Sequence, residues 1–216
     1  MLANLYLLDF DRIVVGWVKD MGGDYYRYSD DILLVVPGDK SIGFTLMTKV
    51  QALIKTFGSK LEIKEAKSSI IEFKGSGDHQ TFELVKGTQG KNGLEYLGFR
   101  FDGRYAYVRD STLSNLYRKV ARSARREANA LARRYSDKSA ADLMVIFDYD
   151  RLIKRFGRVE DFGELHDDYK NWTFWTYARR AAAVFGVLGK PILGQLKRHR
   201  QNIRRRAERE IVKATS

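Results

Sequence analysis

Residues 24–38, DYYRYSDDILLVVPG, decide the fold of the first half of the chain. Two β-prone runs, 25–28 and 32–36, flank a Ser-Asp-Asp step at 29–31, and this arrangement is typical of a hairpin. The unbroken apolar run at 32–36 predicts a strand buried on both faces, which Pro37 and Gly38 end. The pattern therefore places two adjacent carboxylates at a tight turn between two strands.

The chemistry of this turn has two interpretations. Asp30 and Asp31 would project from the edge of a rigid sheet, and a metal site requires rigidly placed ligands. Carboxylates hold Mg²⁺, and a pair of such ions can activate a hydroxyl and stabilise a leaving pyrophosphate. In the alternative interpretation, the turn is an ordinary Asp-rich turn whose side chains accept hydrogen bonds from neighbouring backbone amides. The dipeptide alone does not separate the two.

The rest of residues 1–110 predicts a mixed α+β region around this hairpin. Helical spacing of apolar residues predicts one helix over 2–19 and a second that Ser41 caps and Gly58 ends. Gly-rich turns at 75–77 and 87–93, and an Asp-Gly pair at 102–103, separate short β-prone runs. We expect these strands near 61–63, 69–73, 82–85, 94–101 and 104–108.

The second half, 111–216, predicts only helices. Strand signals cease after Ser111, and apolar periodicity continues in four long segments. We expect helices over about 111–135, 139–157, 169–187 and 191–213. The fold class is therefore α+β, with a mixed first domain over 1–110 and a helical domain over 111–216.

The positive charge of the chain is confined to the helical half. Net charge is +12; residues 1–110 hold 15 basic and 15 acidic side chains, and residues 111–216 hold 24 and 12. This asymmetry favours a region that binds a polyanion, above all nucleic acid. Arg-rich solvated helix faces are the alternative. The candidate nucleic-acid-binding residues are Arg118, Arg122, Arg125, Arg126, Arg204, Arg205 and Arg206.

Several classes of protein are disfavoured. The chain has no cysteine, so disulfides and cysteine-based zinc sites are excluded, and its three histidines lack ligand spacing. No uninterrupted apolar run approaches the length of a membrane span. We expect a cytoplasmic protein that does not contact the membrane.

Four sequence motifs resemble those of reverse transcriptases and occur in the same order. RYSDDILLVV at 27–36 resembles the (Y/F)-x-D-D hairpin of that family, and LANLYLLDFD at 2–11 resembles the helix that ends the preceding motif. KLEIKEAKSSI at 60–70 resembles the following motif, and EYLGFRFDG at 95–103 resembles the primer-grip hairpin. Together the motifs cover residues 2–108.

The resemblance implies an RNA-directed DNA polymerase with a palm over 1–110 and a basic helical thumb over 111–216. Asp30 and Asp31 would be catalytic ligands of Mg²⁺ or Mn²⁺, and Lys67 would protonate the leaving pyrophosphate. The partners would be an RNA template, a DNA primer or product, and deoxynucleotides. The primer grip would consist of Leu97, Gly98 and Phe99.

Further resemblances refine this expectation. FDGRYAYVRDSTL and NWTFWTYARRA, at 171–181, are most similar to defence-associated, abortive-infection-type bacterial enzymes. The family uses a third aspartate from an earlier strand, and Asp9 and Asp11 lie in a predicted helix instead. The sequence thus resembles the carboxy-terminal part of a palm plus a thumb, inactive by itself, whose fingers and third aspartate an upstream polypeptide would carry. The alternative is a non-catalytic nucleic-acid-binding or defence-complex assembly subunit.

Overall fold

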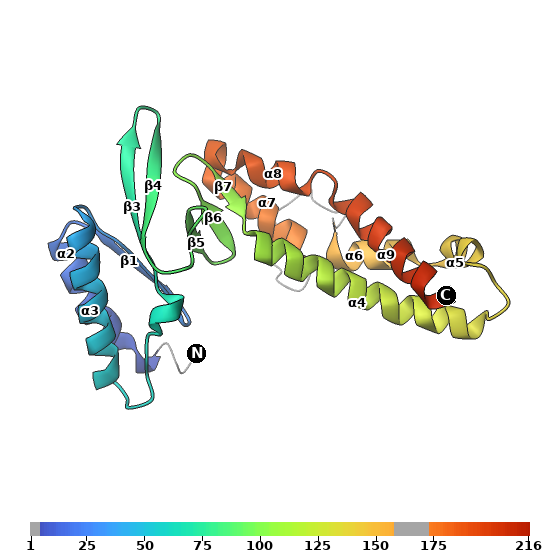
Figure 1. The fold of residues 1–216 in the computed structure, drawn as a ribbon, viewed down its shortest axis with the longest axis horizontal. Helices are drawn as coiled ribbons and strands as arrows, with labels where there is room; N and C mark the ends of the chain where they lie inside the picture. Colours follow the sequence, from blue (N-terminus) through green and yellow to red (C-terminus); the bar gives the residue numbers. More distant parts are fainter. Residues whose placement is uncertain (1–4, 158–172) are drawn as a thin grey trace. The chain divides into compact units, whose positions relative to one another are not determined.

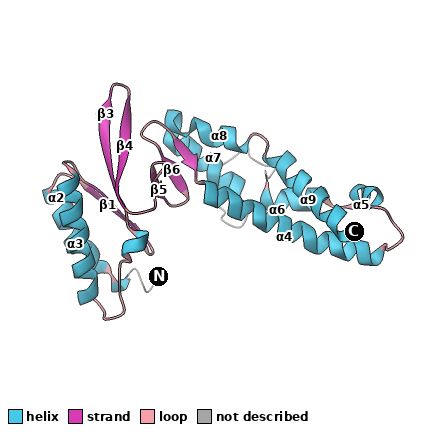
Figure 2. Cartoon of the chain, viewed as in Figure 1, coloured by secondary structure: helices cyan, strands magenta, loops and turns pink. Residues whose placement is uncertain are grey.

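The computed structural model describes residues 5–157 and 173–216 of the chain. The chain forms two compact units, Met1–Arg104 and Tyr105–Ser216. The first combines helices with short antiparallel strands and the second is almost entirely helical, as Figure 2 shows. The predicted mixture of a sheet-containing half and a helical half is therefore confirmed. The structure places the division at 104/105, whereas the sequence pattern placed it after residue 110.

The first unit begins with two helices packed on a β-hairpin. These elements are α2 (Leu8–Asp20), β1 (Asp24–Tyr28), β2 (Asp31–Val35) and α3 (Lys40–Thr56) (Figure 1). Each helix contributes three apolar side chains at four-residue spacing, which places them on one face. Ile32 and Leu34 of β2 pack against this core. Its buried members are Phe10, Val14, Val18, Leu46, Val50 and Ile54.

The hairpin β1–β2 is present as predicted, but β2 is not buried on both faces. Its register pairs Tyr28 with Asp31, so Ser29 and Asp30 form a two-residue loop. In the described part of the chain β2 pairs only with β1. Side chains alternate across a strand, so Ile32 and Leu34 face the helices while Val35 points away and is 50% exposed. A continuous apolar run is compatible with an edge strand because one face alone is enough to anchor it.

Two further hairpins complete the first unit. β3 (Ile70–Ser76) pairs with β4 (His79–Lys86), and β5 (Leu94–Tyr96) pairs with β6 (Phe99–Phe101). The predicted strand over 94–101 is therefore two strands, because Leu97 and Gly98 between them both have positive φ, 46° and 84°. No strand forms at 61–63, where Leu61 and Ile63 instead pack against the helical core.

Asp39, and not Ser41, caps α3. Its carboxylate accepts a hydrogen bond from the Ser41 amide at 2.8 Å, and the helix begins at Lys40. Both residue types are good caps, and the earlier one is used because its backbone is extended.

The second unit is built on two long helices that lie side by side, α4 (Asp110–Arg134) and α9 (His199–Thr215) (Figure 1). Ala124 and Ala128 of α4 and Ala207 of α9 are buried in one core, and such small side chains let helices approach closely. Glu210 of α9, only 5% exposed, accepts a 2.6 Å bond from Arg125 of α4. The other elements are β7 (Ala106–Val108), α5 (Ala140–Ile146), α6 (Tyr149–Phe156), α7 (Phe174–Phe185), η3 (Gly186–Gly189) and α8 (Lys190–Leu196).

The predicted helix over 111–135 is confirmed, but two other predicted helices are each divided. The segment 139–157 breaks before Asp148, whose carboxylate accepts a hydrogen bond from the Arg151 amide at 2.8 Å and so caps α6. The segment 191–213 breaks between α8 and α9. The helix predicted over 169–187 starts partly outside the described residues, and α7 begins at Phe174. No described helix combines the length and the apolar character needed to cross a membrane.

A buried histidine joins three segments of the second unit. His199 Nε2 donates to the Phe156 carbonyl at 2.8 Å, so Nδ1 is left to accept from the Tyr117 hydroxyl at 3.0 Å. Asn202 in turn donates to the Tyr117 oxygen at 3.2 Å. Burial lowers the pKa of His199, although the bond to Phe156 opposes this. The ring therefore binds a proton less readily in the folded state than in the unfolded chain.

We predict that this unit loses stability as the pH falls below about 6.5, the ordinary histidine pKa. The unfolded chain binds a proton at His199 more readily than the folded chain, so unfolding is favoured through the range between the two pKa values. Urea unfolding followed by circular dichroism, at about pH 7.5 and about pH 5, should show a drop in unfolding free energy that is reduced in His199→Gln. His79→Gln, at a partly exposed histidine of the first unit, is the control and should keep the drop. Equal pH dependence in His199→Gln and the unaltered protein would contradict the prediction.

Candidate functional site

The β1–β2 turn is the centre of the candidate site. Ser29 has a φ of 58°, a left-handed conformation that a residue with a Cβ seldom adopts. Asp30 follows it in the loop and Asp31 opens β2. The strained turn must be held in place by something outside itself.

Arg27 holds this turn. Its side chain is 6% exposed, and its guanidinium bonds both oxygens of Asp11 on α2, Nε to Oδ1 at 2.7 Å and a terminal nitrogen to Oδ2 at 2.5 Å. Its other terminal nitrogen donates to the Ser29 carbonyl at 2.8 Å. Tyr25, on the same face of β1, donates its hydroxyl to Asp11 at 2.5 Å. One guanidinium thus ties the backbone of the turn to α2.

The ionisation of this cluster follows from its contacts. Burial alone would raise the pKa of Asp11, but the hydrogen bonds from Arg27 and Tyr25 outweigh it and the pKa lies below its usual value. Burial, then the hydrogen bond to Asp11, raises the pKa of the Tyr25 hydroxyl. Asp11 is therefore an ion-pair partner, and its oxygens are already engaged.

Asp30 and Asp31 are exposed, and within the described residues neither carboxylate has a hydrogen-bond or ion-pair partner. Other turn and cap aspartates of the chain behave differently. Asp39, Asp102 and Asp148 each accept a hydrogen bond from a backbone amide two or three residues later. The interpretation of 29–31 as an ordinary Asp-rich turn requires such bonds, and Asp30 and Asp31 do not make them among the described residues.

Of the predicted primer-grip residues, Leu97 and Gly98 form the loop of the β5–β6 hairpin and Phe99 opens β6. Tyr96 pairs with Phe99, so Leu97 and Gly98 are a two-residue loop with positive φ at both positions. The pKa of Tyr96 is raised, first by burial and then by the negative charge of Asp31. Asp31 therefore lies close enough to this hairpin for its charge to act there.

Lys67 lies at the end of the short helix η1 (Glu65–Lys67) and is exposed. Among the described residues no hydrogen bond or ion pair joins its ammonium to Asp30, Asp31 or another group. The structure thus leaves Lys67 available without bringing it to the turn.

The described part of the chain contains no cluster of three or more acidic or histidine side chains that could hold a metal ion. Asp9 pairs with Arg12 at 3.1 Å on the exposed side of α2, and Asp11 is bound by Arg27. Mg²⁺ in nucleotide-handling sites is commonly held by one or two carboxylates together with substrate phosphates and water. Asp30 and Asp31 fit that donor set, which a substrate would have to complete.

Most of the predicted nucleic-acid-binding arginines have partners within the protein. Arg118 bonds Asn115, and Arg125 bonds Glu210. Arg206 lies over the Tyr117 ring, its guanidinium carbon 4.6 Å from the centroid. Arg204 likewise lies over Tyr149 at 4.9 Å and bonds Glu208 at 3.0 Å. Arg122, Arg126 and Arg205 are exposed and, among the described residues, have no such partner.

The unpartnered cations of α4 form a stripe that sequence reasoning found only in part. At 3.6 residues per turn, Lys119, Arg122, Arg126 and Arg133 fall within about 60° of one another. All four are exposed, and the buried residues of α4 lie on the other side of the helix. We call these four residues the α4 stripe. Lys119 and Arg133 were not among the predicted nucleic-acid-binding residues, although the helical spacing from Arg122 places them on the same face.

Sequence reasoning also missed the role of Arg27. The alternation of DYYRY places Tyr25 and Arg27 on the face of β1 that α2 covers, where an arginine requires a carboxylate partner. That alternation was the available signal. Tyr26 and Tyr28 lie on the opposite face and are exposed.

We predict that Asp11→Asn lowers the unfolding free energy of the first unit by roughly 3 kcal/mol near neutral pH, because it leaves the buried Arg27 without a counter-charge. The lowered pKa of Asp11 means that its contribution is present above the ordinary aspartate pKa, about 4, and is lost as the pH falls through the folded-state value. Denaturant unfolding from about pH 7 to about pH 3 should show the two proteins converging at low pH. Asp9→Asn, at an exposed pair, should change stability little at any pH; a similar effect of both variants would refute the role of the Asp11 pair.

No protein-family model matches the sequence, and no curated protein matches it either.

Proposed function

We propose that the chain is a portion of an RNA-directed DNA polymerase, with Asp30 and Asp31 as two of its catalytic carboxylates. The observation that carries the proposal is a hairpin loop whose backbone is held by Arg27 while both of its aspartates have no partner among the described residues. A turn stabilised from outside leaves its carboxylates free to bind a ligand. The order of the four motifs gives the reaction class.

Each candidate residue has a distinct role in this proposal. Asp30 and Asp31 orient the reacting phosphate and primer groups through the ions that they hold. Bound Mg²⁺ supplies the positive charge that stabilises the attacking and leaving oxygens of nucleotidyl transfer. Lys67 donates a proton to the departing pyrophosphate, and Leu97, Gly98 and Phe99 position the primer end.

A second polypeptide would supply the third carboxylate and the fingers. Two features support this part of the proposal. The described residues offer only two free carboxylates at the turn, and β2 has one edge without a strand partner among them. An unpaired strand edge is a template for another strand. The chain alone is therefore proposed to be inactive.

Metal binding at the turn tests the proposal without requiring activity. Titrating Mn²⁺ with a deoxynucleotide into ¹⁵N-labelled protein should broaden the amide signals of Ser29, Asp30 and Asp31 before others. The broadening should be lost in Asp30→Asn/Asp31→Asn, because the oxygen donors that hold the ion are then neutral. Asp20→Asn/Asp24→Asn, which removes the same charge nearby, is the matched control. Broadening that persists in the first variant would exclude the assignment of the metal ligands.

Primer extension tests the reaction itself. The chain alone should not extend a DNA primer on an RNA template, and extension should appear when the polypeptide encoded immediately upstream is added. Asp30→Asn should abolish that activity, because removing a transition-state charge stabiliser costs roughly a hundredfold or more. An Asp30→Asn protein that still extends the primer would disprove the catalytic assignment.

The second candidate is a non-catalytic nucleic-acid-binding protein, and the α4 stripe favours it. Four exposed cations on one helix face suit a row of phosphates. In this case duplex binding would weaken with salt and would not change in Asp30→Asn/Asp31→Asn. The polymerase proposal also requires the stripe, so metal binding at the turn, and not duplex binding, discriminates the two.

We predict that Lys119→Gln/Arg122→Gln/Arg126→Gln weakens duplex binding and flattens its salt dependence. Each lost phosphate contact should reduce the slope of log K against log salt by roughly 0.9. Fluorescence anisotropy with a labelled RNA–DNA duplex over a salt series measures this. The control Lys55→Gln/Lys60→Gln/Lys91→Gln removes three exposed cations from the first unit and should leave the slope unchanged. Equal slopes for all three proteins would show that the α4 stripe does not bind phosphate.

A further inference from the structure

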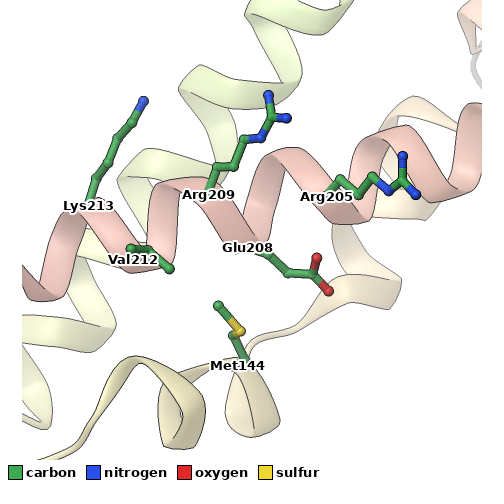
Figure 3. Close-up of a pocket in the computed structure, with 6 residues that line it drawn as sticks. All are labelled: Met144, Arg205, Glu208, Arg209, Val212 and Lys213. Carbon is green, nitrogen blue, oxygen red and sulfur yellow. The ribbon is translucent and has the colours of Figure 1, made fainter.

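A groove runs between α5 and α9 in the second unit, and its volume is about 520 Å³. Figure 3 shows Met144 of α5 on one side, with Val212 and Glu208 on the part of α9 nearest to it. Arg209 and Lys213 extend from α9 away from Met144. The groove thus has an apolar floor and a basic rim, which also includes Arg205.

The charges of the groove are unequal in their availability. Glu208 is paired with Arg204 at 3.0 Å and Lys213 with Glu210 at 3.1 Å. Arg205 and Arg209 are exposed, and in the described part of the chain neither has an ion-pair partner. The free charge of the groove is therefore positive and comes from two arginines.

The spacing of these arginines matches that of a helix. Arg205 and Arg209 are four residues apart on α9, so their Cα atoms are separated by about 6 Å along the axis. Two carboxylates four residues apart on a partner helix have the same separation. Val212 lies on the same exposed side of α9 as the two arginines, about one helical turn beyond Arg209. The basic and apolar parts of the groove therefore run in the same direction along α9.

We propose that this groove binds an acidic amphipathic helix of another protein. Carboxylates of the helix pair with Arg205 and Arg209, and its apolar side chains pack on Met144 and Val212. Methionine suits such a surface because its unbranched side chain adapts to different partners, and arginine is enriched where proteins meet. An amphipathic helix in an apolar groove is a common mode of peptide recognition.

The apolar floor favours a protein over a nucleic acid. A phosphate backbone would satisfy Arg205 and Arg209 but would leave Met144 and Val212 without an apolar partner. Arg205 also lies opposite the buried face of α9, on which Ile203, Ala207 and Ile211 pack. We therefore assign Arg205 to this groove and leave duplex binding to the α4 stripe.

The test uses the full chain and a labelled synthetic peptide of about 18 residues, with leucines on one face and glutamates four residues apart beside them. Two comparison peptides carry lysine in place of glutamate, or serine in place of leucine. Fluorescence anisotropy should show that the Leu/Glu peptide binds and that both comparison peptides bind roughly tenfold more weakly or worse. Equal binding of the serine peptide would overturn the proposal, because it would reduce the groove to a general polyanion surface.

Charge reversal locates the binding. Arg205→Glu/Arg209→Glu should weaken the binding of the Leu/Glu peptide by roughly tenfold or more and should strengthen the binding of the Leu/Lys peptide. Lys154→Glu/Arg200→Glu makes the same change of charge at exposed, unpaired positions elsewhere and should do neither. Circular dichroism checks that both variants fold. If Arg205→Glu/Arg209→Glu leaves peptide binding intact, or if its main effect is loss of duplex binding, the groove is not the proposed site.

Discussion

The first unit depends on a single buried guanidinium. Arg27 lies on the face of β1 that α2 covers. It bonds both oxygens of Asp11 and donates a hydrogen bond to the carbonyl of Ser29. A buried cation is tolerated only with a counter-charge and satisfied donors, and this one has both. The same group therefore seats the hairpin on α2 and holds the loop in a conformation that its residues would not choose alone. The bonds that attach the hairpin to α2 and the bond that holds the turn therefore come from the same side chain.

The freedom of Asp30 and Asp31 is a consequence of that arrangement. An aspartate in a turn or at a helix N-cap can stabilise the backbone by accepting a hydrogen bond from an amide, as Asp102 does in a turn and Asp39 and Asp148 do at helix starts. Because Arg27 stabilises the turn from outside it, the carboxylate oxygens of Asp30 and Asp31 make no hydrogen bond to other described residues. In the proposed metal site, Arg27 would have the structural role and Asp30 and Asp31 the ligand-binding role.

The sequence predicted the helical segments and the β1–β2 hairpin well, but it did not predict which strands and side chains contact one another. Helix α4 follows from its sustained periodicity, and the hairpin follows from two β-prone runs around Ser-Asp-Asp. The burial of β2 was wrong because an apolar run does not state how many neighbouring strands exist. The ion pair between Asp11 and Arg27 joins residues sixteen positions apart. The alternation of β1 indicates that Arg27 needs a carboxylate partner, but it does not identify which carboxylate. The hairpin that carries Asp30 and Asp31 was thus predictable, whereas the hydrogen bond from Arg27 that holds its turn was not.

Charge composition likewise identified a basic half but not its available charges. Arg125 is bound by a nearly buried Glu210, so it joins α4 to α9 and contributes little field to solvent. Arg204 and Arg206 lie over tyrosine rings, and these cation–π contacts make their guanidinium groups less available to a ligand. The cations that remain available lie in two different surroundings. The α4 stripe has no apolar floor, whereas Arg205 and Arg209 of α9 lie beside one. Because phosphate requires only charge and an amphipathic helix requires both, the two surfaces differ in the ligands they favour although the same residue types form them.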